Sequence, residues 1–177
     1  MEHYLVITAV GTNRQGISNQ ITHHISECNC NIVDSRIANF GAEFTLIMLL
    51  SGNNNSLSRV EATLPLVGQQ HDLLIVMKRT SKHTAIDSSH RAVIKAQLDD
   101  TPGIIQQYTE FLASRTIDIS TLKTDTEQSN QEHSAPQLHI EITTRLPDSI
   151  DLDKLEQDFM ALGEKLNATS SINFMPR

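Results

Sequence analysis

The chain repeats itself, and this internal repeat restricts the possible folds more than any other feature. When Gly16 is placed on Gly103, an offset of 87 residues, the apolar residues after each glycine also coincide. The residues that superimpose are Ile17, Ile21 and Ile25 on Ile104, Tyr108 and Leu112. Their spacing of four predicts one face of a helix in each copy. The repeat therefore indicates two copies of one structural unit in tandem.

A second helical pattern repeats at an offset of 95 residues. Its apolar residues are Leu57, Val60, Leu64 and Val67 in the first copy and Leu152, Leu155, Phe159 and Leu162 in the second. Ser58 with Glu61, and Asp153 with Glu156, are typical of helix N-terminal caps. Pro65 predicts an end or a kink in the first of these two helices. The change of offset predicts an insertion of about eight residues, which we assign to the polar segment 127–134.

Strand patterns surround the helices in the same order in both copies. They cover residues 4–10, 32–40, 43–50 and 72–79, and then 91–99, 117–124, 137–146 and 171–175. The order β-α-β-β-α-β is that of the ferredoxin-like fold with an antiparallel sheet. We therefore predict an α+β protein with module 1 at residues 1–82, a linker at 83–90 and module 2 at 91–177. An open sheet face, an edge strand or a helix face of such modules could pair with a neighbour, so we also expect a homo-oligomer.

Charge is distributed unevenly between the copies. Residues 1–83 hold six acidic and six basic residues, whereas residues 84–177 hold fifteen acidic and eight basic ones, so the whole net charge of −7 lies in the second copy. An acidic surface repels the phosphate backbone, which argues against direct DNA binding. The basic run 78–82 is interpreted as a solvated strand end. The chain shows neither a secretory signal nor an apolar run long enough to cross a bilayer, and we expect it in the cytoplasm.

The turn that precedes the first helix of each copy is the most informative local feature. Asn13 and Asp100 are good N-cap residues, and Gly16 and Gly103 follow three positions later. The start of a helix presents unpaired N–H groups that suit a carboxylate, and the Asn or Asp oxygen could accept from an ammonium group. This combination would suit an amino acid. The same residues also serve many turns purely as caps, so the sequence leaves both interpretations open.

Together these motifs resemble the ACT domain. The resemblance rests on the module order, on Asp-x-x-Gly after the first strand, and on Asn31-Ile32 or Asp118-Ile119 at the second strand. Stretches such as His3–Ala9, Cys30–Arg36, Glu43–Gly52 and Asp72–Thr80 more closely resemble the tandem-ACT repressor family of the glycine cleavage operon.

ACT modules usually bind amino acids where two modules meet, so the resemblance implies a set of ligand-binding residues. These are Asn13, Gly16, Ile17 and Asn31 in copy one and Asp100, Gly103, Ile104 and Asp118 in copy two. Copy one departs from the family pattern Asp-x-Pro-Gly through Asn13 and Gln15, which weakens the prediction there. Copy two keeps Asp100-Thr101-Pro102-Gly103.

The resemblance further implies a regulator that binds a DNA-bound transcription activator of the glycine cleavage operon, with glycine relieving repression. The alternative is a regulatory subunit that controls a metabolic enzyme. An enzyme is not expected. His23 and Glu27 lie four apart without a third ligand at a recognisable spacing, and Cys28 and Cys30 are too close for an ordinary disulfide framework and lack a second pair for zinc. No phosphate-binding, dinucleotide-binding or Gly-x-Ser-x-Gly motif occurs, so neither a metal nor a cofactor is predicted.

Overall fold

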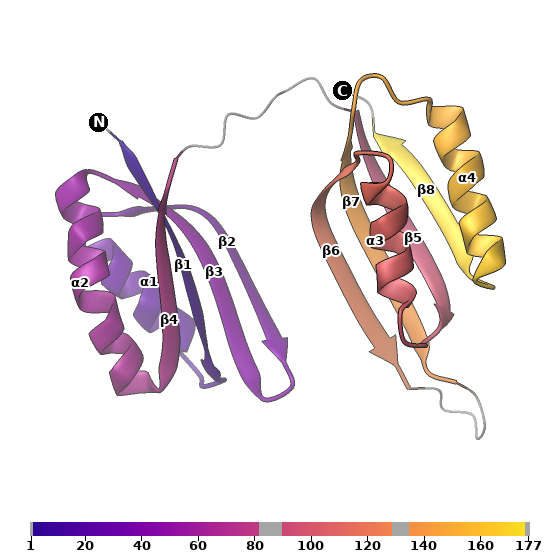
Figure 1. Ribbon diagram of the computed structural model, residues 1–177. Helices are drawn as coiled ribbons and strands as arrows, with labels where there is room; N and C mark the ends of the chain where they lie inside the picture. The colour runs from indigo at the N-terminus through magenta and orange to yellow at the C-terminus, as the bar shows by residue number, and fades with distance from the viewer. Residues whose placement is uncertain (1, 82–89, 129–134, 176–177) are drawn as a thin grey trace. The chain divides into compact units, whose positions relative to one another are not determined.

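The computed structural model describes residues 2–81, 90–128 and 135–175 (Figure 1). The chain divides into two compact units between residues 84 and 85, and each is described here by itself. This division falls within residues 82–89, outside the described residues. The exact module boundaries at 82, 83–90 and 91 therefore stay a prediction.

The first unit is a four-stranded antiparallel sheet with two helices. Its elements are β1 (His3–Thr12), α1 (Ile17–Glu27), β2 (Asn31–Phe40), β3 (Glu43–Gly52), α2 (Asn54–His71) and β4 (Leu73–Thr80). The strand order is β2-β3-β1-β4. All three neighbouring pairs are antiparallel, as a βαββαβ connection requires.

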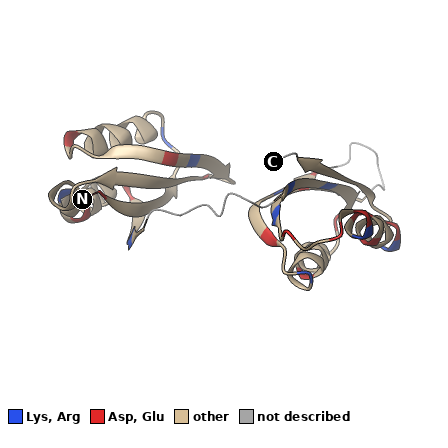
Figure 2. Cartoon of the chain, turned by 90° about the horizontal axis from the view of Figure 1, so that it is seen from above, with Lys and Arg blue, Asp and Glu red and all other residues tan. Residues whose placement is uncertain are grey.

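The second unit repeats this topology. Its elements are β5 (His90–Asp99), α3 (Ile104–Ala113), β6 (Asp118–Glu127), β7 (Gln137–Leu146), α4 (Leu152–Lys165) and β8 (Thr169–Met175). The strand order is β6-β7-β5-β8. Both helices lie on one side of this sheet (Figures 1 and 2). The predicted α+β class with two ferredoxin-like modules is confirmed.

The core of each unit lies between the sheet and its helices because strand residues alternate between two faces. In β1 the inward residues Leu5, Ile7 and Ala9 are fully buried, while their neighbours are not. The helices contribute the faces that the sequence predicted: Ile17, Ile21, Ile25, Leu57, Val60 and Leu64 in the first unit, and Ile104, Tyr108, Leu112, Leu155 and Phe159 in the second. The opposite face of each sheet is not covered by a helix of its own unit.

The two units have the same uncommon backbone conformations at equivalent positions. A β-bulge interrupts β2 between Ile32 and Asp34, and another interrupts β6 between Ile119 and Thr121, 87 residues later. Left-handed residues also correspond: Asn29 with Thr116 at an offset of 87, and Asp72 with Asn167 at an offset of 95. These positions have φ between 53° and 57°, a region that non-glycine residues rarely adopt. The coincidence supports duplication independently of the side chains.

The predicted N-terminal caps of α2 and α4 are wrong. The N-cap residues of α2 and α4 are Asn53 and Asp151, whose side chains accept from the Ser56 and Lys154 amides at 2.9 and 3.0 Å. The predicted cap pairs lie inside the helices, because α2 begins four residues before Ser58. Ser58 and Glu61 instead bind the guanidinium of Arg79 on β4.

Pro65 does not end its helix, which continues to His71. Of the two predicted outcomes, the end is wrong and the kink stays a prediction. Leu64 and Gly68, on either side of Pro65, are both buried in the unit. This packing holds the helix together across the missing backbone hydrogen bond.

The insertion lies in the hairpin of the second unit. Residues 41–42 connect β2 to β3, whereas residues 128–136 connect β6 to β7. The predicted segment 127–134 overlaps this turn, although Glu127 is still part of β6. Residues 129–134 lie outside the described residues.

Candidate functional site

The two predicted ligand loops have the same geometry. Gly16 and Gly103 are the residues before α1 and α3, with φ of 85° and 90°. Asn13 and Asp100 are therefore not the N-caps, and that prediction is wrong: the left-handed glycine bends the chain into the helix three residues later. Because a glycine occupies the cap position, no cap side chain accepts from the amides of the first turn. A Cβ on either glycine would meet nothing within 4 Å, so the space in front of both turns is open.

Each loop is tied to the end of its β-hairpin. The Asn13 amide donates to the Ala42 carbonyl at 3.2 Å, and the Asp100 amide donates to the Pro136 carbonyl at 2.8 Å. In the second unit the Thr126 hydroxyl also donates to the Asp100 carboxylate at 3.1 Å. This bond orients Asp100 and leaves its other oxygen able to accept. The second loop thus offers an oriented carboxylate beside a helix start with no side-chain cap.

Ile17 and Ile104 contribute only backbone to these loops. Both side chains are buried in the core. Their amides donate to the turn itself, to the Arg14 carbonyl at 3.2 Å and the Thr101 carbonyl at 3.4 Å. The amides that remain for a ligand belong to the next residues of the first turn, Ser18 and Asn19 in α1 and Ile105 and Gln106 in α3.

Asn31 and Asp118 lie at the other end of their sheets. Asn31 pairs with Ser51, which pairs with Tyr4 at the start of β1, whereas the ligand loop follows Thr12. The separation is eight residues along β1, about 27 Å at the usual rise per residue. Asp118 is placed in the same way, opposite Arg145 and far from Asp100. Within one unit, therefore, the structure brings together Asn13, Gly16 and Ile17, or Asp100, Gly103 and Ile104, but not the residue on the second strand.

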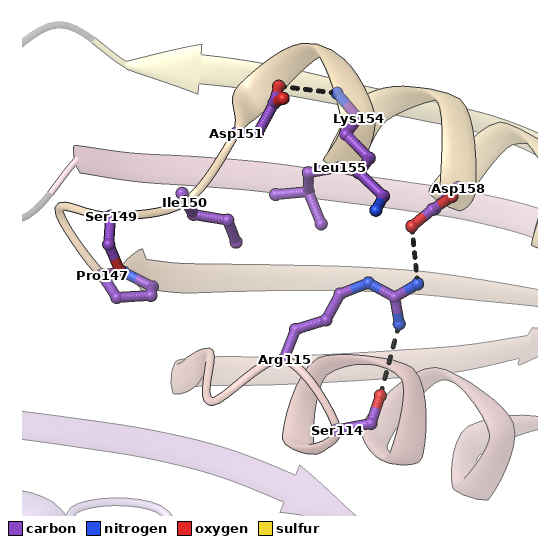
Figure 3. A pocket seen from close by; sticks show the side chains of 9 residues that line it. All are labelled: Ser114, Arg115, Pro147, Ser149, Ile150, Asp151, Lys154, Leu155 and Asp158. Atoms are coloured by element: carbon purple, nitrogen blue, oxygen red, sulfur yellow. Dashed lines mark hydrogen bonds and ion pairs between the residues drawn. The ribbon is translucent and has the colours of Figure 1, made fainter.

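A cavity of about 530 Å³ opens where α3 and α4 meet in the second unit (Figure 3). Arg115, just after α3, reaches across it and donates to the Asp158 carboxylate of α4 at 2.8 Å. The same guanidinium donates to the Phe111 carbonyl at 3.1 Å and lies 3.9 Å from the centre of the Phe111 ring. Asp151 and Lys154 also line the cavity. The ion pair joins the two helices, and both of its charges are already matched within the unit.

The corresponding junction of the first unit has different side chains. The offsets of 87 and 95 residues place His24, Cys28 and Thr63 where Phe111, Arg115 and Asp158 stand. His24 Nε2 lies 2.7 Å from the Thr63 hydroxyl and 4.0 Å from the Cys28 sulfur. The Arg115–Asp158 pair was not predicted from the sequence. The signal that could have found it is the pair of offsets, which aligns Cys28 with a basic residue and Thr63 with an acidic one.

The remaining candidates for chemistry have ordinary surroundings. Cys28 is buried, and burial raises the pKa of the Cys30 thiol, which favours the less reactive protonated form. His23 and Glu27 form an exposed pair at 3.6 Å on α1. No group of three metal-binding side chains gathers among the described residues. None of the described helices is long and apolar enough to cross a membrane.

Comparison with known proteins identifies the family. The ACT domain pattern matches residues 3–78. Glycine cleavage system transcriptional repressors from Escherichia coli K12 and Shigella flexneri are each 46% identical over 172 residues, covering 97% of this chain and 90% of theirs. The chain belongs to this repressor family. Both ACT modules of the family are present, although the ACT pattern itself matches only the first.

Solved structures agree with this assignment. A crystal structure provisionally assigned as a glycine cleavage system transcriptional repressor is 41% identical, with a TM-score of 0.76 over 100% of this chain and 99% of the other. An unknown protein from Galdieria sulphuraria has the same fold, with 19% identity, a TM-score of 0.79 and coverage of 99% and 100%. The repressor family and the tandem ACT fold therefore coincide over nearly the whole chain.

Proposed function

We propose that this chain is a glycine-responsive transcriptional repressor that acts on the glycine cleavage operon by binding a transcription activator rather than DNA. The observation that carries the proposal is the 46% identity to repressors of that name over 97% of the chain. The proposal includes a cytoplasmic location and the absence of an enzymatic activity.

The charge of the second unit supports binding to a protein rather than to DNA. Its helix α4 contains Asp153, Glu156, Asp158 and Glu164 against Lys154 and Lys165. Acidic and basic residues are also mixed on its sheet, as in the ion pair of Lys95 with Glu141 (Figure 2). Neutralising DNA phosphates requires clusters of Lys and Arg. An acidic surface suits basic segments of a protein partner instead.

The loop before α3 is the better glycine site of the two. A glycine zwitterion needs donors for its carboxylate and an acceptor for its ammonium group. The open first turn of α3 supplies N–H donors and partial positive charge. Asp100 supplies a full negative charge oriented by Thr126. Asn13 offers only an amide oxygen in the first loop, and charge-assisted hydrogen bonds are about twice as strong as neutral ones.

Glycine relieves repression in this scheme through linkage. A ligand that binds more tightly to the activator-free repressor weakens the complex by the ratio of its two affinities. The activator weakens glycine binding by the same factor, since coupling of binding equilibria is reciprocal. A coupling of about 1–3 kcal/mol changes the affinity roughly 5- to 150-fold, enough for a metabolic response.

The test is to measure the affinity of the full chain for the activator with and without glycine. The chain is immobilised, the activator protein is titrated, and the dissociation constant is determined at several glycine concentrations. We expect the activator affinity to fall as glycine rises.

A matched variant separates the loop from the rest of the proposal. Asp100→Asn should bind the activator like the natural chain but lose most of the glycine response. Activator binding that ignores glycine would contradict the ligand assignment and leave the adaptor role standing. If the chain bound no activator but captured DNA of the operon directly, the adaptor role itself would be wrong.

A further inference from the structure

The open face of the first sheet, the side away from α1 and α2, is apolar. Strand alternation places Phe40, Ile47, Leu74 and Val76 on this side, and their exposed fractions are 69%, 50%, 68% and 57%. Half-buried Val6, Val10 and Leu49 lie between them. Contiguous apolar surface of this kind marks an interaction site.

The pairing register arranges this open face in rows across the four strands. One row reads Asp34, Leu49, Val6, Lys78 from β2 to β4; the next reads Arg36, Ile47, Thr8, Val76; the third reads Ala38, Thr45, Val10, Leu74. The first row has an acidic residue at one end, a basic residue at the other and apolar residues between them. Such a row is complementary to a copy of itself turned end to end.

We propose that the open face of the first sheet binds the same face of a second copy of this chain about a two-fold axis. The axis is parallel to the strands, lies midway between the two packed sheets and passes above the boundary between β3 and β1. This axis reverses the strand order, so β2 of one copy lies over β4 of the other. Asp34 then lies opposite the partner's Lys78, and by symmetry the contact occurs twice. Leu49 lies opposite the partner's Val6 at the centre of the same row.

Space for the partner is present at β2. A hollow of about 80 Å³ beside the bulge is lined by side chains that include Val6, Asp34, Arg36 and Ile47. The proposed axis places the partner's Val76 and Lys78 over it. Asp34 also lies 3.5 Å from Arg36 of its own strand, but this contact is exposed and leaves the second carboxylate oxygen able to accept from the partner's lysine.

The area is sufficient for a specific dimer. Four strands about 4.8 Å apart and eight paired residues long outline roughly 500 Å² on each copy. Two flat faces of this size bury about 1,000 Å² in total, and side chains that project from the sheets add to this area. The total reaches the size that specific interfaces need. Two sheets packed face to face, about 10 Å apart, are a common arrangement of antiparallel sheets.

The open face of the second sheet is charged at the equivalent positions. Its row Lys123, Glu141, Lys95, Ser171 corresponds to Arg36, Ile47, Thr8, Val76. Lys95 and Glu141 form an ion pair at 3.0 Å on that face. A charged face of this kind is stable in water, so the second unit provides matched control positions.

The test is the association of the full chain by sedimentation velocity over a concentration series. We expect a dimer whose dissociation constant rises at least tenfold in Asp34→Lys and in Lys78→Asp, because each reversal places like charges together twice. The double variant Asp34→Lys with Lys78→Asp should return the dissociation constant to near that of the natural chain. Leu74→Lys should give a monomer.

Controls come from the second unit. Thr121→Lys and Asn173→Asp stand at the positions equivalent to Asp34 and Lys78, and both should leave the dimer unchanged. Circular dichroism establishes that every variant is folded. A natural chain that stays monomeric, single variants without effect, or a double variant that fails to recover would each overturn the proposal. If Leu74→Lys left association unchanged but abolished activator binding, the face would belong to the activator instead.

Discussion

The two units have the same backbone fold and differ in the surfaces that lie outside their cores. Bulges, left-handed turns and buried helix faces recur at fixed offsets, because each unit needs them to close the same βαββαβ fold. The helix junction and the open sheet face have changed. The first unit joins its helices through His24 and Thr63 and has exposed apolar residues on its open sheet face, whereas the second has an ion pair at the junction and a charged face. Duplication has thus conserved the fold and left each unit free to acquire its own contacts.

The largest effect on stability is expected from a substitution in the aromatic core of the second unit. Phe159 lies within 6.0 Å of Tyr108 and 5.9 Å of Phe111, measured between ring centres, whereas the first unit has Leu64 at the equivalent position. Phe159→Ala should lower the free energy of unfolding by about 3–5 kcal/mol. Hydrogen exchange should show lost protection in 90–175 and not in 2–81. Phe159→Leu, which restores the residue of the first unit, should cost markedly less, and equal costs for the two variants would contradict this packing.

A smaller effect is expected at the helix junction. Arg115→Met keeps the aliphatic stem but removes the bond to Asp158, the bond to the Phe111 carbonyl and the charge over the ring. We expect a loss of about 1–2 kcal/mol in urea unfolding, moderate because both charges are about one-third exposed. The loss should shrink in high salt, since screening weakens exposed pairs. Cys28→Ala, the counterpart in the first unit, should show no dependence on salt, and a salt-independent Arg115→Met would argue against the ion pair.

The smallest effect concerns pH and the first unit. Arg79 donates to both oxygens of Glu61 at 2.6 and 2.7 Å, and these bonds lower the pKa of Glu61 against the opposing effect of burial. The carboxylate therefore contributes stability above its ordinary pKa, and this contribution is lost as the pH falls through the lowered pKa of the folded state. Glu61→Gln should cost up to about 1 kcal/mol at neutral pH and nothing in acid.

The second unit supplies the control for this pH effect. Glu156 stands where Glu61 does, but Phe174 replaces Arg79. Glu156→Gln should therefore leave the dependence of unfolding on pH unchanged. If both variants altered the pH profile alike, the Arg79–Glu61 pair would not be its source.

Most of the fold could be predicted from the sequence, because apolar periodicity and the two offsets report on the core directly. The strand 137–146 was predicted with its observed bounds, and each of the others differs by one to three residues at one or both ends. Helix starts were predicted less well. Several polar residues compete for each cap, and α2 is capped by Asn53, five residues upstream of Ser58.

The candidate site was harder to predict than the fold. Asn13 and Asp100 lie in the predicted loops, but the sequence does not show that a glycine takes the cap position and leaves the first turn open. The contact between Thr126 and Asp100 and that between Arg115 and Asp158 join residues 26 and 43 positions apart. Such contacts depend on how the helices and the hairpin pack, which periodicity does not encode.

Calorimetric titration of glycine into the full chain and two loop variants tests the proposed glycine site directly. We expect saturable binding by the natural chain, at least tenfold weaker binding by Asp100→Asn because a charge-assisted bond to the ammonium group is lost, and no weakening in Asn13→Asp. A natural chain that takes up no glycine, or an Asp100→Asn chain that binds glycine as tightly as the natural one, would contradict it.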